Sequence, residues 1–179
     1  MKDVEFARRC QALKLVLSDV DGVMTDGKLL LLPGGAEAKS FHVRDGLGLV
    51  VARRAGLRTG LISGRTSEEV ARRAAELGLD VVRQGVKDKV ACLREVLSGL
   101  GLEAREVAYM GDDFNDLPLL KEVGLSAAPA DAPSEIQEAV FLVTTRRGGE
   151  GCLREFVEGI LRTRGDWERA LALFGGGPS

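Results

Sequence analysis

The stretch KLVLSDVDG, residues 14–22, decides the fold class of this chain. Its apolar first half runs into two aspartates, Asp19 and Asp21, and then into Gly22. A short apolar run that stops at turn residues is typical of a buried strand in a parallel sheet. Because ligands of such sheets bind beyond the carboxyl ends of the strands, the two aspartates also mark a candidate site.

Similar apolar runs recur along the chain and alternate with segments of helical periodicity, which predicts an α/β fold with parallel strands joined by crossover helices. The predicted strands are residues 14–18, 58–62, 81–83, 107–110, 125–127 and 141–143. The predicted helices are residues 47–55, 67–77, 87–100, 116–122, 134–139 and 151–163.

Residues 28–41 interrupt this alternation, because two extended pieces flank the turn sequence PGG at 33–35. We predict a β-hairpin inserted after the first strand. Its first arm contains LLLL at 29–32, an apolar run that a monomer would expose together with an open strand edge. We predict a single domain over residues 1–174, which includes this hairpin, and a flexible tail at 175–179.

Composition argues against several other classes of protein. The 179 residues are 45% hydrophobic and 29% charged, which suits one compact domain. A formal charge of −2 offers no basic field, so we expect no nucleic-acid partner. No apolar run approaches the ~20 residues of a membrane span, and the charged N-terminus is unlike a signal peptide, so we expect a cytoplasmic protein without a membrane partner. The cysteines at 10, 92 and 152 form no close pair and predict reduced packing residues.

Three carboxylates crowd the turn GDDFND at 111–116, directly after the predicted strand 107–110. Asp112, Asp113 and Asp116 would repel one another unless a cation offsets their charge. Mg²⁺ suits such a turn because it takes oxygen ligands and typically recruits one or two carboxylates. An aspartate capping the next helix is the simpler alternative, but it accounts for only one of the three.

Two further strand ends carry groups that suit an oxyanion. Ser63, Gly64 and Arg65 offer a hydroxyl, an unhindered backbone amide and a guanidinium after the strand 58–62. Lys89 stands in a first helical turn, where a cation opposes the helix dipole, and it could hold a phosphate and balance the acidic turn. A simple helix cap at Ser63 and a solvated lysine at Lys87 are the alternatives.

Taken in order, DxDG at 19–22, Ser63, Lys89 and GDDxxD at 111–116 resemble the four motifs of the haloacid dehalogenase superfamily of phosphohydrolases. The resemblance is closest to its 3-deoxy-D-manno-octulosonate 8-phosphate phosphatase family and runs from about residue 13 to residue 167. The similar strings are DVDGVMTDG (19–27), FHVRDGLG (41–48), ISGR (62–65), QGVKDK (84–89), GDDFNDLPLL (111–120), VGLSAAPADA (123–132) and GGEGCLRE (148–155).

This resemblance implies a Rossmann-like parallel sheet flanked by helices, with the short hairpin in place of a cap domain. It also implies Mg²⁺ dependence and a homotetramer, in which four hairpins form a central barrel and neighbouring subunits help to close each active site. The implied reaction releases phosphate from a phosphorylated sugar acid, a step in lipopolysaccharide precursor synthesis.

The resemblance also implies a role for each motif residue. Asp19 would attack phosphorus and form an aspartyl phosphate, while Asp21 would act as the general acid and base. Mg²⁺ would be held by Asp19, Asp112 and the backbone carbonyl of Asp21. The transferring phosphoryl group would be bound by Ser63 and Lys89. Lys89 and the waters on the metal would be oriented by Asp113 and Asp116.

The sugar acid is expected to bind near Gly64, with Arg65, Arg73 and Arg44 as candidates for its carboxylate. Arg73 follows Arg65 by eight residues on what we predict to be one helix, so the two side chains should project in similar directions. A solvated arginine-rich face is the alternative. Arg146 and Arg147 are candidates to reach a neighbouring subunit's site.

Three other functions fit parts of the pattern. The same chemistry on a nine-carbon sugar acid 9-phosphate, of the ketodeoxynononate or sialic acid type, uses the same motif residues. A catalytically silent phosphate-binding or scaffolding protein would not need both Asp19 and Asp21. A receiver domain that stores phosphate on an aspartate is disfavoured, because Asp21 would hasten hydrolysis of the stored group.

Overall fold

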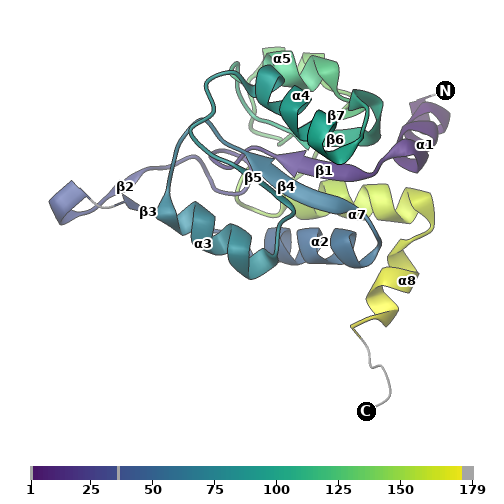
Figure 1. The fold of residues 1–179 in the computed structure, drawn as a ribbon, viewed down its shortest axis with the longest axis horizontal. Helices are drawn as coiled ribbons and strands as arrows, with labels where there is room; N and C mark the ends of the chain where they lie inside the picture. The colour runs from purple at the N-terminus through teal and green to yellow at the C-terminus, as the bar shows by residue number, and fades with distance from the viewer. Residues whose placement is uncertain (1, 36, 175–179) are drawn as a thin grey trace.

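The computed structural model describes residues 2–35 and 37–174. Its main feature is a parallel six-stranded sheet in the order β5-β4-β1-β6-β7-β8 (Figure 1). This confirms the predicted α/β class and all six strands to within one residue at each end. The strands are β1 (Leu15–Ser18), β4 (Arg58–Ile62), β5 (Val81–Arg83), β6 (Val107–Met110), β7 (Leu125–Ala128) and β8 (Leu142–Val143).

The order of the strands places the candidate site. From β1 the chain proceeds outward through β4 and β5, and it then returns to the other side of β1 for β6, β7 and β8. β1 is therefore the point where the strand order reverses, and crevices at such points are where α/β sheets bind ligands. The turn that contains Asp19 and Asp21 leaves the carboxyl end of this strand.

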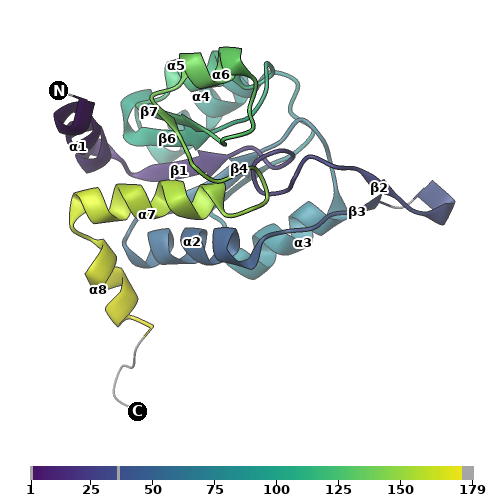
Figure 2. The same ribbon diagram turned by 180° about the vertical axis from the view of Figure 1, so that it is seen from behind.

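Helices cover both faces of the sheet (Figures 1 and 2). β1 is buried along its whole length, and its alternate side chains enter two apolar clusters, Val16 in one and Leu15 and Leu17 in the other. The first cluster lies under α1, α2, α3, α7 and α8, and the second lies under α4, α5 and α6. The helices are α1 (Lys2–Ala12), α2 (Val43–Arg54), α3 (Glu68–Leu77), α4 (Lys89–Leu100), α5 (Leu117–Glu122), α6 (Ser134–Ala139), α7 (Cys152–Arg164) and α8 (Trp167–Ala172).

The structure corrects several helix predictions. α2 begins at Val43, four residues before the predicted start, because the His42 ring accepts the backbone N–H of Arg44 and caps the helix. Histidine is not among the usual capping residues. α1 and α8 were not predicted, because α1 is mostly polar and α8 has only six residues, and each is held by a few buried side chains such as Cys10 and Trp167.

The predicted hairpin is confirmed. β2 (Leu30–Leu31) pairs antiparallel with β3 (Glu37–Ala38) around a short helical turn at Pro33–Gly35. Figures 1 and 2 show this arm projecting away from the sheet and its helices. Leu29, Leu30, Leu31 and Leu32 are all exposed. The predicted flexible tail at 175–179 lies outside the described residues.

One other expectation agrees with the structure. The three cysteines are free and buried, as packing residues should be. Within residues 2–35 and 37–174, no helix has the length and apolar character that a membrane crossing requires.

Candidate active site

A cavity of about 250 Å³ opens at the carboxyl ends of β4, β1 and β6. These three strands are neighbours in the sheet, so the turns that follow them meet at one edge. The residues that line the cavity are Asp19, Asp21, Gly27, Ser63, Gly64, Arg65, Asp112, Asp113 and Asn115. The folded chain thus brings together the residues of three motifs that lie up to 96 positions apart, from Asp19 to Asn115.

The fourth motif residue, Lys89, does not line the cavity itself but contacts the lining residue Asp19 from the first turn of α4. Its buried ammonium lies 2.8 Å from Asp19 Oδ2 and 2.6 Å from Asp116 Oδ1. Burial alone would lower the pKa of Lys89, but the charges of the two carboxylates outweigh burial and raise it. Lys89 is therefore a fixed positive charge beside Asp19.

Asp116 is held by three donors. Its Oδ1 accepts the Lys89 ammonium and the Tyr109 hydroxyl, the latter at 2.5 Å, and its Oδ2 accepts the backbone N–H of Asp112 at 3.1 Å. Tyr109 is fully buried on β6 and was not predicted from the sequence. A tyrosine in a buried strand reads as an ordinary core residue, so only its hydroxyl contact shows that it belongs to the polar network.

Among the described residues, the carboxylates of Asp19, Asp112 and Asp116 form a cluster that could hold a metal ion. One oxygen from each lies within 4.8 Å of the others. Burial and the charge of Asp116 raise the pKa of Asp19 to about 7, and burial and the charge of Asp19 raise the pKa of Asp112 to about 8. A divalent cation would relieve this repulsion. Since the oxygens of Asp116 already accept three hydrogen bonds, Asp19 and Asp112 are the better placed ligands.

Gly22 makes room for this arrangement. A Cβ at residue 22 would lie 1.9 Å from Asp112 Oδ2, and the residue has a φ of +88°, which side chains rarely adopt. The loop after β1 can therefore pass directly over the Asp112 carboxylate. Oxygen donors in this close setting fit a hard divalent cation such as Mg²⁺.

The hairpin contributes two charged residues that sequence reasoning missed. The buried Lys39 ammonium donates a hydrogen bond to Asp21 Oδ1. Glu37 accepts two hydrogen bonds from Arg65, at 2.6 and 2.8 Å, and the Arg65 guanidinium also lies 3.7 Å from Asp21 Oδ2. The only sequence signal was a lysine and a glutamate on the second hairpin arm, a pattern that more often faces solvent.

Comparison with known proteins matches residues 52–155 to the haloacid dehalogenase-like hydrolases. A 3-deoxy-D-manno-octulosonate 8-phosphate phosphatase from Haemophilus influenzae is 39% identical over 158 residues, 88% of each chain. The corresponding phosphatase of Yersinia pestis is 37% identical and covers 93% of this chain and 89% of its own. The chain belongs to the haloacid dehalogenase-like hydrolases.

A solved structure agrees with this assignment. The 3-deoxy-D-manno-octulosonate 8-phosphate phosphatase from Moraxella catarrhalis, described as a complex with magnesium, phosphate and the sugar acid, superposes with a TM-score of 0.91. It is 35% identical, and the match covers 95% of this chain and 98% of that one. This haloacid dehalogenase-like hydrolase is therefore a phosphatase, and its Rossmann-like sheet is confirmed.

Asp113 does not contact Lys89 in this hydrolase, although the resemblance implied that it would help to orient that lysine. Its Oδ1 accepts the backbone N–H of Phe114 at 2.7 Å, while Lys89 contacts Asp116. Of the two aspartates, only Asp116 contacts Lys89 among the described residues. Asp113 instead lines the cavity, from the turn before α5.

The candidate arginines are separated from one another. Arg65 lines the cavity of about 250 Å³ described above, which we call the reaction cavity. Arg73 lines an adjacent cavity of about 220 Å³ together with Lys39 and Arg72. The prediction that Arg65 and Arg73 share a helix is wrong, because α3 begins only at Glu68, after its Ser67 cap. Arg65 belongs to the loop that precedes this cap.

Three further arginines lie away from the reaction cavity. Arg44 and Arg146 line a third cavity, between α2 and α7. Arg147 is exposed and pairs with Asp131 at 3.3 Å. Within one chain, Arg44 is therefore not brought to the carboxylates that would bind the metal.

Proposed function

We propose that this phosphatase hydrolyses 3-deoxy-D-manno-octulosonate 8-phosphate to the free sugar acid and phosphate, with Mg²⁺ as its cofactor. The observation that carries the proposal is the wall of the reaction cavity, where the candidate nucleophile Asp19 contacts the buried Lys89 at 2.8 Å and a second aspartate, Asp21, lies two residues on. The named substrate of the relatives and the magnesium, phosphate and sugar acid of the Moraxella catarrhalis complex support the choice of substrate and metal.

In the first half of the reaction, Asp19 attacks phosphorus in line with the departing sugar oxygen. The P–O bond to the sugar breaks as the bond to Asp19 forms, and Asp21 gives a proton to the sugar oxygen. In the second half, Asp21 removes a proton from water, which attacks the same phosphorus and releases Asp19 and phosphate. The aspartyl phosphate intermediate splits one difficult displacement into two easier ones.

The phosphoryl oxygens are bound by Lys89, Ser63 and Gly64. Lys89 supplies a fixed charge, and the buried Ser63 supplies a hydroxyl beside the unhindered amide of Gly64. Asp19, Asp112 and the Asp21 carbonyl would hold Mg²⁺, whose charge would screen the repulsion between the nucleophile and the phosphate dianion. The hydrogen bonds of Asp116 orient Lys89, so Asp116 acts through it.

Magnesium should stabilise the folded protein in a pH-dependent way. Without metal, the pKa values of Asp19 and Asp112 are raised above the ordinary 3.8 to about 7 and about 8. An acid with a raised pKa binds its proton more tightly when folded, so its contribution to stability is complete below about pH 4 and is lost as the pH rises through about 8. Mg²⁺ binds the deprotonated carboxylates and reverses this loss.

We expect Mg²⁺ at about a hundredfold excess over its Kd to raise the Tm by roughly 5–10 °C at about pH 8.5 and by much less at about pH 5. Differential scanning calorimetry in Mg²⁺ and in chelator measures this shift. Asp112→Asn should lose the shift, whereas Asp26→Asn, in an exposed loop aspartate that pairs with Lys28, should keep it. An equal shift in Asp112→Asn would remove Asp112 from the metal site.

The cavity next to the reaction cavity suits the substrate carboxylate. Lys39 lines it and also contacts Asp21, so the two cavities meet at this side chain. The guanidinium of Arg73 also lines this cavity. Among the described residues it forms one ion pair, with Glu76 at 3.1 Å, and its buried Nε has no hydrogen-bond partner. A guanidinium binds a carboxylate through two parallel hydrogen bonds.

Arg73→Ala should therefore lower kcat/KM for the sugar acid phosphate by roughly ten- to a hundredfold, since a charged hydrogen bond contributes ~1.5–3 kcal/mol. Hydrolysis of para-nitrophenyl phosphate, which has no carboxylate, should fall far less. The exposed Arg94, on α4, provides the control variant Arg94→Ala. Equal losses on both substrates would show that Arg73 supports the fold or the phosphate site instead.

The exposed hairpin supports association of this chain into a homotetramer. Leu30 and Leu31 are 59% and 70% exposed, and the arm that carries them extends away from its own domain (Figure 2). Burying four such arms together would remove both the apolar patch and the open strand edge.

Light scattering at micromolar concentration should return about four times the chain mass of 19.1 kDa. Leu30→Lys combined with Leu31→Glu should shift the protein to smaller species, because charge is then forced into the shared apolar contact. Leu173→Lys, which adds a charge at an exposed leucine near the end of α8, should leave the mass unchanged. A wild-type monomer would contradict the tetramer.

The substrate is tested by a phosphate-release assay with Mg²⁺ on three compounds. These are 3-deoxy-D-manno-octulosonate 8-phosphate, a nine-carbon sugar acid 9-phosphate and a neutral sugar phosphate of similar length. We expect the eight-carbon acid to be the best substrate and both acids to exceed the neutral sugar. A higher kcat/KM for the nine-carbon acid would reassign the substrate, and equal rates for acid and neutral sugars would contradict carboxylate recognition.

A further inference from the structure

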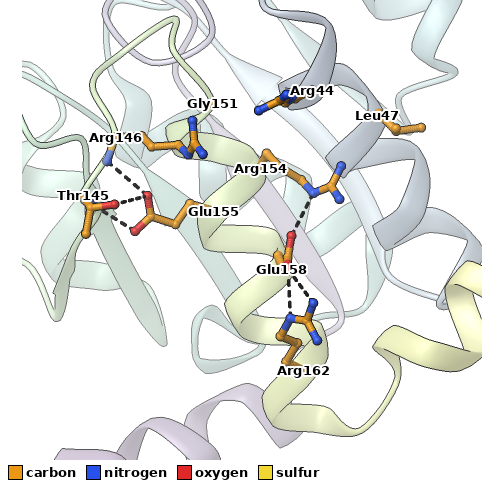
Figure 3. A pocket seen from close by; sticks show the side chains of 9 residues that line it. All are labelled: Arg44, Leu47, Thr145, Arg146, Gly151, Arg154, Glu155, Glu158 and Arg162. Carbon is orange, nitrogen blue, oxygen red and sulfur yellow. Dashed lines mark hydrogen bonds and ion pairs between the residues drawn. The ribbon is translucent and has the colours of Figure 1, made fainter.

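We propose that the cavity between α2 and α7 binds a small multivalent oxyanion, a molecule with two or more carboxylate or phosphoryl groups. This cavity measures about 600 Å³, against about 250 Å³ for the reaction cavity, and the two share no lining residue. Figure 3 shows its lining residues along α7, from Gly151 to Arg162, with the side chains of Arg44 and Arg146 near the Gly151 end.

The charges around this cavity are unbalanced. Four arginines and two glutamates line it, which leaves two net positive charges. Both glutamates are already engaged. Glu158 accepts hydrogen bonds from Arg154 at 3.2 Å and from Arg162 at 2.8 Å, and Glu155 accepts the backbone N–H groups of Thr145 and Arg146 at 2.8 and 3.1 Å.

Two guanidinium groups are thus left without an acidic partner. Arg44 and Arg146 form no ion pair within residues 2–35 and 37–174, and the Arg146 side chain has a single hydrogen bond, at 3.4 Å, to the backbone carbonyl of Glu150. Guanidinium groups bind carboxylate and phosphoryl oxygens through paired hydrogen bonds. A ligand with two anionic groups would give both guanidinium groups an acidic partner at once.

The walls that carry these arginines are held in place by buried contacts. The Asp45 carboxylate, next to Arg44 on α2, accepts the backbone N–H of Gly151 at 3.2 Å and that of Arg154 at 2.7 Å. Asp45 thereby ties the first turn of α2 to the first turn of α7. On the other side, Glu155 fixes the loop of Arg146 through three hydrogen bonds to Thr145 and Arg146. A fixed frame reduces the entropy that binding would cost.

The lining also limits what kind of molecule the ligand can be. Leu47 is the one large apolar side chain among the lining residues, and none of them is aromatic. A nucleotide base would find no aromatic side chain among them to stack on, and an acyl chain would find a single large apolar side chain. The volume lies within the ~300–1,000 Å³ range of small-molecule sites. The fitting ligand is a compact polar polyanion.

The test measures binding of two probes to the full-length, Mg²⁺-loaded protein by isothermal titration calorimetry at low salt. Phosphonoacetate carries a phosphonate and a carboxylate, whereas tricarballylate carries three carboxylates. We expect at least one probe to bind with a Kd below about 1 mM, and the tighter probe indicates which anionic group the site prefers. Added salt should weaken this binding.

Arg44→Gln combined with Arg146→Gln should weaken the binding at least about tenfold. Arg65→Gln, in the reaction cavity, should not weaken it. The double lysine variant, Arg44→Lys with Arg146→Lys, should recover part of the affinity, which separates loss of charge from loss of fold. Calorimetric unfolding of each variant checks that the domain is intact.

Three results would overturn the proposal. The first is that neither probe binds the wild-type protein. The second is that affinity falls in Arg65→Gln but not in the Arg44 and Arg146 double variant, which would place the probe in the reaction cavity. The third is that light scattering of the double glutamine variant shows smaller species, which would make this cavity a contact between copies of the chain.

Discussion

Asp19→Asn is expected to lower kcat by at least about a thousandfold while the protein still folds. An amide keeps the size and the hydrogen bond of the carboxylate to the Val20 N–H, but it is a poor nucleophile and a weaker metal ligand. Phosphate release in saturating Mg²⁺ measures the loss, and the unfolding transition checks the fold. In chelator, removing a buried charge next to Asp116 should leave the Tm near or above that of the wild type.

Asp26→Asn is the matched control, because this aspartate lies seven residues further on in the same loop and pairs with the exposed Lys28. Its turnover should stay within a few-fold of the wild type. Asp21→Asn separates the two aspartates by chemistry, since its loss should be smaller on para-nitrophenyl phosphate, whose leaving group needs no proton. Wild-type turnover in Asp19→Asn would remove this residue as the nucleophile.

Lys89→Met is expected to damage both stability and activity. Lys89 is buried and lies between Asp19 at 2.8 Å and Asp116 at 2.6 Å. Removing it leaves the buried Asp116 charge with only two neutral donors, the Tyr109 hydroxyl and the Asp112 N–H. Breaking a buried ion pair in this way typically costs ~3–5 kcal/mol of the free energy of unfolding.

Turnover of Lys89→Met should also fall by two orders of magnitude or more, because the phosphoryl oxygens lose a charged donor in a site shielded from water. Urea unfolding and phosphate release measure the two effects. Lys87→Met is the control, since this lysine is exposed two residues earlier. If Lys89→Met were as stable and as active as Lys87→Met, the network that joins Lys89 to Asp19 and Asp116 would have no part in either property.

The central sheet could be predicted because its signals are local. A strand buried on both faces must be apolar along its length, as LVLS in β1 and VAYM in β6 are, and the turn residues that end each strand are equally visible. The two helices that were missed lack such signals, since α1 is mostly polar. Their position depends on what they pack against and not on their own pattern.

The motif residues could be predicted for a related reason. Carboxylates that directly follow apolar strands, as Asp19 and Asp112 do, serve no packing purpose, so their chemistry is apparent without a structure. Their meeting in one cavity then follows from parallel strands ending at a common edge. The ordered motifs also identified the phosphatase family, which the comparisons confirm.

The sequence by itself therefore determined the α/β class, the family and the acidic edge where we propose that the reaction takes place, because each depends on local patterns or on an ordered set of motifs. Only the tertiary structure decided which polar side chains meet. It brings Lys39 to Asp21 and Tyr109 to Asp116, and it places Arg65 in a different cavity from Arg73 and from Arg44. Such contacts join residues from separate elements, and a polar side chain reads the same in sequence whether packing leaves it in solvent or brings it to a buried partner.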